Sequence, residues 1–257
     1  MDYIQYHKHN RIAFITLDRP EKRNALNHAF VSELKKAFAM ANDDDDVKAV
    51  ILRGHGEAFC AGADLAYLQD LQRFSYEENL ADSNHLKELF LQIYTLKKVV
   101  IAQVEGDAIA GGSGLATCCD FVFSVPHAKF GYTEVKIGFI PAIVMVFLLR
   151  KIGAARSKEL LLTGNLITAE AALAVGLINR ILPAAEIEHE VILFATRLIE
   201  SNSANSMMMT KQMIADVQSM NLEEALAHAC EMNARARNSA DCKTGIDAFL
   251  KKEKIKW

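Results

Sequence analysis

Two glycine-containing segments carry residue types suited to holding a negatively charged oxygen. Residues 59–65 read FCAGADL, and residues 106–114 read GDAIAGGSG. Each segment follows an apolar run that is typical of a buried strand, and each leads into a helical pattern. Small residues at two such strand-to-helix turns can bring two unpaired backbone N–H groups to one point. A pair of donors of this kind suits acyl transfer or enolisation, because in both reactions a carbonyl oxygen gains negative charge.

The elements that must position these turns follow from hydrophobic periodicity and from capping residues. Strand 99–104 precedes the second turn, and Asn27 and Thr168 are predicted N-caps of two helices. The predicted strands are 3–6, 12–17, 47–52, 99–104, 121–125, 129–130 and 177–182. The predicted helices are 28–42, 64–71 with Leu65, Leu68 and Leu71 inside, 76–96, 112–118, 143–152, 157–162, 169–175, 185–200, 204–219 and 222–238.

The order of these elements predicts a mixed α/β protein. Strand–strand–helix units of similar length recur, which indicates a spiral of stacked ββα turns, although this pattern alone does not separate the spiral from other α/β folds. Only helical periods remain after residue 185. We therefore expect a core over residues 1–184 and a C-terminal helical region over residues 185–257. Its methionines either fill a core or form an oligomer interface.

Bulk composition narrows the classes of function. The chain has 257 residues, 51% of them hydrophobic, and a net charge of −3. A large core is expected, and nothing in the charge pattern indicates nucleic-acid binding. No apolar stretch is long enough to span a membrane, and no secretory signal is recognisable. The five cysteines show no zinc spacing, so we expect reduced thiols, no metal and a cytoplasmic location.

The chain resembles the crotonase superfamily, also called the enoyl-CoA hydratase/isomerase family, over nearly its whole length. Any one of the matching segments alone would be a weak signal, but all of them occur in the order and spacing of the family. They are residues 19–26 (RPEKRNAL), 59–65, 106–120, 130–141 (FGYTEVKIGFIP), 162–164 (LTG) and 174–178 (AVGLI).

The resemblance implies a crotonase-like spiral fold and an enzyme that stabilises the enolate of an acyl-CoA thioester. Ala63 and Gly111 match the family's two oxyanion donors, and Glu134 matches its second catalytic carboxylate. The apolar surroundings of Glu134 should raise its pKa toward the working pH. The alternative for Glu134 is a solvated carboxylate paired with Lys129 or Lys136.

The chain departs from the family pattern at Gly114, where hydratases usually carry a first glutamate. The leading prediction is that the enzyme hydrates a 2-enoyl-CoA. Substrates with a branched acyl chain are part of this prediction. The alternative is Δ3-Δ2 enoyl-CoA isomerisation, since one carboxylate suffices to move a proton between two carbons. A catalytically lapsed acyl-CoA-binding protein is a third reading. Neither Asp107 nor Asp120 is an assumed replacement, and Ser113 either holds a water or simply begins a helix.

The resemblance also implies a binding site for the CoA part of the substrate, with no separate cofactor. A neighbouring subunit would complete the nucleotide site, and the helical tail would form a homotrimer or a dimer of trimers. Tyr132 either lines the acyl site or fills the core. The implied substrate-binding residues are Arg23, Ala25, Ala61, Asp64, Leu65, Tyr132, Phe249 and Lys252.

Overall fold

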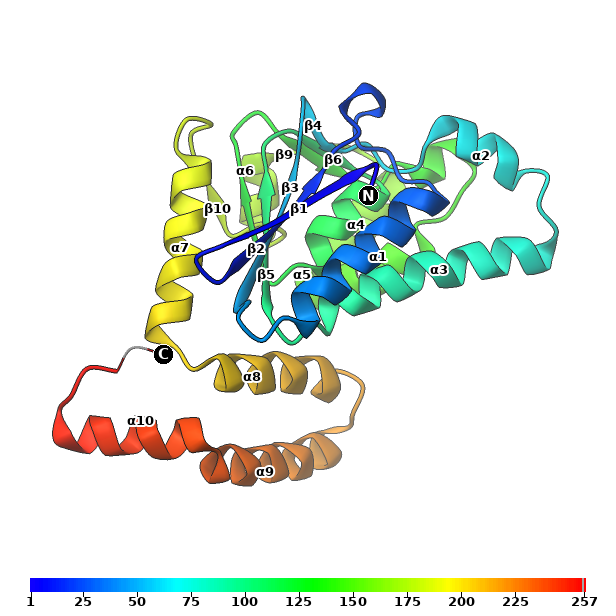
Figure 1. The fold of residues 1–257 in the computed structure, drawn as a ribbon. Helices are drawn as coiled ribbons and strands as arrows, with labels where there is room; N and C mark the ends of the chain where they lie inside the picture. Colours follow the sequence, from blue (N-terminus) through cyan, green and yellow to red (C-terminus); the bar gives the residue numbers. More distant parts are fainter. Residues whose placement is uncertain (256) are drawn as a thin grey trace.

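The protein is built from two β-sheets, helices that cover them, and a layer of C-terminal helices (Figure 1). This computed structural model describes residues 1–255 and 257. The strands are β1 (Ile4–His9), β2 (Ile12–Leu17), β3 (Ala49–Gly54), β4 (Ala58–Cys60), β5 (Val99–Val104), β6 (Asp107–Ile109), β7 (Phe121–Ser124), β8 (Lys129–Gly131), β9 (Ile167–Thr168) and β10 (Arg180–Ile181).

The helices alternate with strand pairs until β10 and then follow one another to the end of the chain. They are η1 (Pro20–Lys22), α1 (His28–Asp43), α2 (Leu65–Leu71), α3 (Tyr76–Tyr94), α4 (Gly111–Cys118), η2 (Glu134–Ile137), α5 (Ala142–Thr163), α6 (Ala169–Ala174), α7 (Ile187–Ser201), α8 (Ala204–Val217), α9 (Leu222–Asn238) and α10 (Ala240–Lys251). The helices η1 and η2 are short 3₁₀ turns.

The chain winds as a spiral that contributes one strand to each sheet in every turn. The larger sheet has the order β1-β2-β3-β5-β7-β10, and the smaller sheet has the order β4-β6-β8-β9. The pairs β3/β4, β5/β6 and β7/β8 are successive in the chain but lie in different sheets. Gly106 makes one of these steps possible, because a Cβ there would lie 2.1 Å from the carbonyl oxygen of Glu57. The predicted ββα spiral is confirmed.

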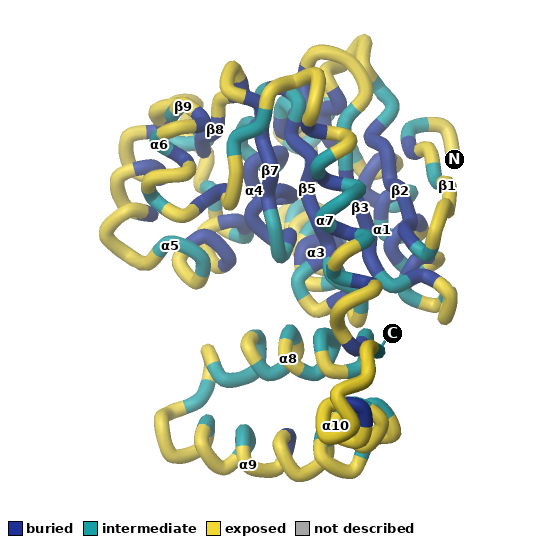
Figure 2. The backbone as a smooth tube through the Cα atoms, turned by 90° about the vertical axis from the view of Figure 1, so that its left-hand side faces the viewer, coloured by how far each residue is buried: buried dark blue, intermediate teal, exposed yellow. Residues whose placement is uncertain are grey.

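The core lies on both faces of the larger sheet. All six residues of β2 are buried, as expected for a strand of a sheet covered on both sides. Helices α1 and α3 lie on one face and α7 on the other (Figure 1). The burial pattern in Figure 2 shows the strands as the most buried part of the molecule.

The predicted helix starts are confirmed by their capping hydrogen bonds. The Asn27 side chain accepts a hydrogen bond from the Phe30 N–H at 2.9 Å, and the Thr168 side chain accepts one from Ala171 at 3.3 Å. Two helices predicted near residues 143–162 form α5, which is interrupted at Gly153, where φ is +74°. The predicted strand 177–182 is wrong in length, because β10 has only two residues.

The C-terminal helices differ in how they pack. Helix α7 packs on the larger sheet through Ile187, Val191, Ala195 and Ile199, whereas α8–α10 form a separate layer below the core (Figures 1 and 2). Helix α10 was not predicted, because Ser239 ends α9 and also caps α10 with no glycine or proline between them. The division at residue 185 remains a prediction, and by packing α7 lies with the core. Among the described residues, no helix combines the length and apolar character needed to cross a membrane.

Candidate active site

The three predicted catalytic residues follow the carboxyl ends of three neighbouring parallel strands of the smaller sheet. Ala63 follows β4, Gly111 follows β6 and Glu134 follows β8. Strand β6 pairs in parallel with both β4 and β8. The sheet therefore brings the three residues to one edge, which is where sites of parallel α/β sheets are usually found.

The backbone around Ala63 is held by an isolated β-bridge to Leu26, so that the Ala63 N–H group points away from Leu26. The Leu26 N–H donates to the Gly62 carbonyl at 2.6 Å, and the Asp64 N–H donates to the Leu26 carbonyl at 2.8 Å. Because the C=O and N–H groups of one trans peptide point in opposite directions, and the Gly62 C=O faces Leu26, the Ala63 N–H faces away from Leu26. Ala63 is exposed, and within the described chain its N–H has no backbone partner.

The second donor lies at the start of α4. Gly111 is the first residue of this helix, so its N–H has no carbonyl partner within the helix. The turn is fixed by a hydrogen bond from the Ala110 N–H to the Gly131 carbonyl at 2.7 Å. Ala110 has φ +50° and ψ −119°, which is a strained backbone for a residue with a side chain. Strain of this kind often occurs where the backbone must be aimed for function.

The two donor turns touch each other. A Cβ added at Gly62 would lie 2.9 Å from the Ala110 Cβ and 3.6 Å from the Gly111 nitrogen. Gly62 also has φ +89°, a conformation that strongly favours glycine. The structure thus places the Ala63 and Gly111 peptides side by side, with unpaired N–H groups at the positive end of α4.

Glu134 has the environment expected of a general base. Its Oε2 atom is buried and, across residues 1–255 and 257, accepts no hydrogen bond. Burial raises the pKa of the Glu134 carboxyl, and a hydrogen bond from its own N–H only partly opposes this. The alternative of a pair with Lys129 or Lys136 finds no support, because the buried Oε2 atom of Glu134 accepts no hydrogen bond from either lysine. An uncompensated buried carboxylate favours a functional role.

The position of the missing first glutamate is filled by apolar side chains. A Cβ added at Gly114 would lie 2.3 Å from Cγ1 of Val144 and 3.1 Å from Cζ of Phe90. Asp120 is paired with Lys211 at 2.7 Å, and Asp107 accepts the Lys129 N–H at 3.0 Å. Neither aspartate therefore replaces the glutamate.

Ser113 has a structural role in the same helix. Its hydroxyl donates to the Ala108 carbonyl at 2.6 Å and accepts the Gly131 N–H at 3.1 Å. These bonds tie α4 to β6 and β8. The hydroxyl is therefore engaged in fixing the fold, and of its two predicted alternatives the structural one is supported.

Arg19, which the sequence did not single out, contacts two of the predicted substrate-binding residues, Asp64 and Ala25. Asp64 caps α2 by accepting the Ala66 N–H at 2.8 Å, and its carboxylate lies 2.7 Å from Nη1 of Arg19. Arg19 also donates to the Ala25 carbonyl at 3.2 Å. Asn24, which sequence reasoning passed over, is fully buried and donates to the His55, Ala58 and Phe59 carbonyls. Asn24 has a left-handed backbone, with φ +54°, and the sequence does not reveal this conformation.

The other predicted binding residues divide into accessible and buried groups. The Arg23 side chain is 59% exposed and lies 3.6 Å from Asp107, while the Ala61 N–H donates to the Arg23 carbonyl. Leu65 is 79% exposed, so its predicted interior position in α2 is wrong. The helix begins at Leu65 and buries none of its residues.

Tyr132 is fully buried, and its hydroxyl lies 2.6 Å from the Thr117 hydroxyl. The premise that Tyr132 and Glu134 share one strand face is wrong, because β8 ends at Gly131 and Glu134 begins η2. A side chain with no exposed surface supports the packing alternative for Tyr132.

Phe249 and Lys252 lie in and directly after α10, in the layer of C-terminal helices. Phe249 is 82% exposed. Lys252 ends the helix with a left-handed backbone. Figure 1 shows α10 on the far side of α8 from the core, away from α2 and α4. Within one chain these two residues are not brought together with Ala63, Gly111 and Glu134.

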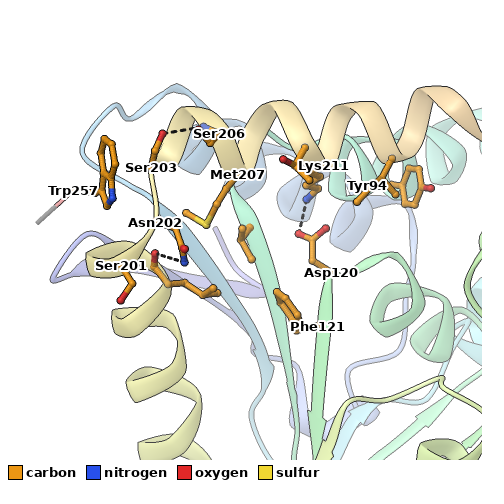
Figure 3. A pocket seen from close by; sticks show the side chains of 14 residues that line it. Tyr94, Asp120, Phe121, Ser201, Asn202, Ser203, Ser206, Met207, Lys211 and Trp257 are labelled. Carbon is orange, nitrogen blue, oxygen red and sulfur yellow. Dashed lines mark hydrogen bonds and ion pairs between the residues drawn. The ribbon is translucent and has the colours of Figure 1, made fainter. Parts of the chain in front are cut away.

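A cavity of about 740 Å³ lies elsewhere, between α8 and the start of β5 and β7 (Figure 3). Its lining includes Asp120, Lys211 and Trp257 but none of the predicted site residues. Asp120 and Lys211 neutralise each other, so neither is a free acid or base. In the part of the chain that the structure describes, no group of three or more potential ligands could hold a metal ion.

Comparison with known proteins agrees with this geometry. The pattern of the enoyl-CoA hydratase/isomerase family matches residues 7–257, and the chain belongs to that family. A Thermus thermophilus protein is 42% identical over 94% of this chain and 95% of its own length. The crotonyl-CoA hydratase of Syntrophomonas wolfei is 33% identical, covering 97% of this chain and 95% of its own. A crystal structure of an enoyl-CoA hydratase from Shewanella pealeana superposes with a TM-score of 0.93 at 28% identity, over 99% of this chain and 96% of that one. The predicted family, fold and enzyme class are confirmed.

Proposed function

We propose that the protein adds water to the double bond of a 2-enoyl-CoA thioester, using Glu134 as its single acid and base. The observation that carries this proposal is the unpartnered, buried Oε2 of Glu134 at the edge where two free N–H groups meet. Relatives named as enoyl-CoA hydratases support the same reaction class.

The proposed mechanism has one intermediate, the enolate of the thioester. Glu134 takes a proton from water as the water oxygen bonds to C3, and the π electrons move through C2 to the thioester oxygen. The Ala63 and Gly111 N–H groups donate hydrogen bonds to that oxygen, and each such donor is typically worth about 3 kcal/mol. Glu134 then returns its proton to C2, and the carbonyl re-forms. A raised pKa helps because the carboxyl must both lose and regain a proton.

A second reaction, migration of a double bond from C3 to C2, is favoured by the apolar filling at Gly114. Glu134 would remove a proton from C2 of a 3-enoyl-CoA, and the electrons would form a dienolate at the same two donors. The same carboxyl would return the proton to C4. This reaction needs no bound water and no second carboxylate, and Val144 and Phe90 leave space for neither at position 114.

The CoA part is proposed to lie along the loop that precedes α1. Arg23 offers an accessible guanidinium for a phosphate, and the backbone of Ala25, Ala61, Asp64 and Leu65 borders the path. Phe249 and Lys252 would act on a neighbouring subunit's nucleotide site in a homotrimer or a dimer of trimers. Their distance from their own chain's site supports this arrangement.

The test is a panel of 2-enoyl- and 3-enoyl-CoA esters followed by NMR in D₂O. Oxygen at C3 of the product identifies hydration, and a shifted alkene with deuterium at C2 or C4 identifies isomerisation. Glu134→Gln should lower either rate by about 10²–10⁴ while CoA-ester binding persists. Glu231→Gln, at an exposed position of α9, is the matched control. Turnover by Glu134→Gln at the wild-type rate would reject the assignment.

A further inference from the structure

Helix α4 is bonded along one of its faces to the end of β8. The Ala110 N–H donates to the Gly131 carbonyl at 2.7 Å, and the Ser113 hydroxyl accepts the Gly131 N–H at 3.1 Å. One helical turn beyond Ser113, the Thr117 hydroxyl lies 2.6 Å from the Tyr132 hydroxyl. Residues three and four apart lie on the same side of a helix, so the three contacts form one row. This row ties α4 to the last residue of β8 and to the residue after it.

The hydrogen bond between Thr117 and Tyr132 has a defined direction. Thr117 Oγ1 donates to the Ser113 carbonyl at 2.7 Å, which uses the one proton of this hydroxyl. Tyr132 is therefore the donor in the 2.6 Å contact, and Thr117 Oγ1 is the acceptor. Both side chains are buried, so water does not compete for the bond. The Lys151 ammonium donates to the Thr117 carbonyl at 3.1 Å and fixes the backbone of the acceptor.

This bond connects the two parts of the proposed site. Gly111 begins α4, so Thr117 and the proposed oxyanion donor belong to one short helix. Tyr132 is separated by a single residue from Glu134, which begins η2. Burial is the main cause that raises the pKa of the Tyr132 hydroxyl, and the Glu134 carboxylate acts in the same direction, as a nearby negative charge should. Tyr132 is thus bonded to the helix of the donor and lies close to the base.

We propose that Tyr132 is a positioning residue, whose hydrogen bond to Thr117 sets the place of Glu134 relative to the Gly111 N–H. The Oε2 atom of Glu134 accepts no hydrogen bond in the described part of the chain, so the base must be located by its neighbours. Tyr132 gives its proton to Thr117 and so does not also donate to Glu134. The inference rests on the proposed function, because it takes Glu134 as the base and Gly111 as a donor.

Tyr132→Phe tests the hydrogen bond without removing the ring. The variant leaves no buried donor unpaired, because the Thr117 proton remains on the Ser113 carbonyl. We expect kcat to fall by about 10-fold to 10²-fold, since a small displacement of a reacting group is costly. KM should stay close to that of the wild type, and Tm should fall by only roughly 2–4 °C. Tyr94→Phe, beside the cavity of Figure 3, is the matched control and should leave kcat unchanged.

A double variant separates positioning from stability. Thr117→Val leaves the Tyr132 hydroxyl buried without its acceptor, so its Tm should be lower than that of Tyr132→Phe. Combining Thr117→Val with Tyr132→Phe removes the unpaired donor and should restore part of the lost Tm. The kcat of the double variant should nevertheless stay low, because the bond is still absent. Thr117→Ser keeps a hydroxyl and should retain the wild-type kcat.

Three results would overturn the inference. The first is a wild-type kcat in Tyr132→Phe, and the second is a kcat that recovers together with Tm in the double variant. The third is a raised KM with an unchanged kcat, which would make Tyr132 part of the substrate pocket.

Failure of the proposed function gives a different result. A wild-type protein that turns over neither class of ester would reject the proposed reaction. Crystal structures of the wild type and of Tyr132→Phe would still decide the positioning role. The distance from the carboxyl carbon of Glu134 to the Gly111 nitrogen should differ between them by more than about 0.5 Å. An unchanged distance would overturn the role of Tyr132 in either case.

Discussion

Arg19 and Asp64 form a largely buried ion pair in which Nη1 of Arg19 lies 2.7 Å from Oδ2 of Asp64. Burial alone would raise the pKa of the Asp64 carboxyl, but the Ala66 N–H and the Arg19 guanidinium outweigh it and hold the pKa below its usual value. Asp64 directly follows Ala63, so this pair fixes the backbone on one side of a proposed oxyanion donor. We therefore expect Arg19 to act as a positioning residue for the proposed site.

Arg19→Met should destabilise the protein and weaken catalysis together. Removing the guanidinium leaves the Asp64 carboxylate buried without its partner, which typically costs about 3–5 kcal/mol. A shifted Ala63 N–H should lower kcat more than it raises KM, because the donor acts mainly on the enolate. Thermal melts and steady-state kinetics measure the two effects. Arg156→Met, which removes an exposed pair with Glu159, is the control and should change neither. An unaltered kcat in a folded Arg19→Met protein would contradict the positioning role.

Gly111→Pro should remove an oxyanion donor with little damage to the helix. Proline is well tolerated at the first position of a helix, where Gly111 lies. Loss of the N–H should lower kcat by about 10²–10³. Gly111→Ala is the matched control, since it adds a Cβ 3.1 Å from Cδ1 of Leu26 but keeps the N–H. Comparable rates for the alanine and proline variants would show that the Gly111 N–H is not a donor.

Glu134→Gln should stabilise the protein in a pH-dependent way. Burial raises the pKa of Glu134 above its ordinary value of 4.5, so the folded state binds the proton more tightly than the unfolded chain. The stability associated with this proton is fully present below pH 4.5 and is lost as pH rises through the folded pKa. The difference in Tm between Glu134→Gln and wild type should be near zero at pH 4 and positive at pH 8. A negative difference at pH 8 would mean that the ionised carboxylate is favourably held.

Activity should increase as the Glu134 carboxyl loses its proton. Glu134 begins either reaction as a base, so kcat/KM should rise with pH through a pKa above 4.5. A pH–rate profile between pH 4 and 8 measures this. A profile already flat at pH 5 would show that the pKa of Glu134 is not raised.

Local signals in the sequence predicted most of the fold because capping and periodicity are local properties. Asn27, Asp64 and Thr168 are short polar residues before apolar helical periods, and each is an N-cap in the structure. Ala63, Gly111 and Glu134 each come shortly after a strand of the smaller sheet. Because these strands are neighbours, the sheet brings the three residues to one edge.

The errors come from contacts between distant segments. The pairing of Arg19 with Asp64 joins residues far apart in sequence, and no local pattern reports it. Leu65 looks like an interior residue by its type, yet it is 79% exposed, and α2 buries none of its residues. Val144 looks only like an apolar residue of a helix in the sequence, and its packing against Gly114 joins two helices that are distant along the chain.

Lys211→Met should loosen the layer of C-terminal helices from the core without direct damage to the chemistry. The Lys211 ammonium on α8 donates to Asp120 at 2.7 Å (Figure 3). It also donates to the carbonyls of Ile93 and Lys98. Its loss leaves Asp120 without a cation in a partly buried setting, which should cost roughly 3 kcal/mol.

Thermal melts should therefore show a lower Tm for Lys211→Met, whereas Lys243→Met on the exposed side of α10 should melt like the wild type. Because the cavity beside Lys211 holds none of the proposed catalytic residues, kcat should stay within a factor of about two below the melting range. If the subunits assemble through α8–α10, sedimentation should also report a weaker oligomer. A large fall in kcat with an unchanged Tm and an unchanged oligomer would instead place Lys211 in the reaction, and would move the active site to the cavity at the start of β5 and β7.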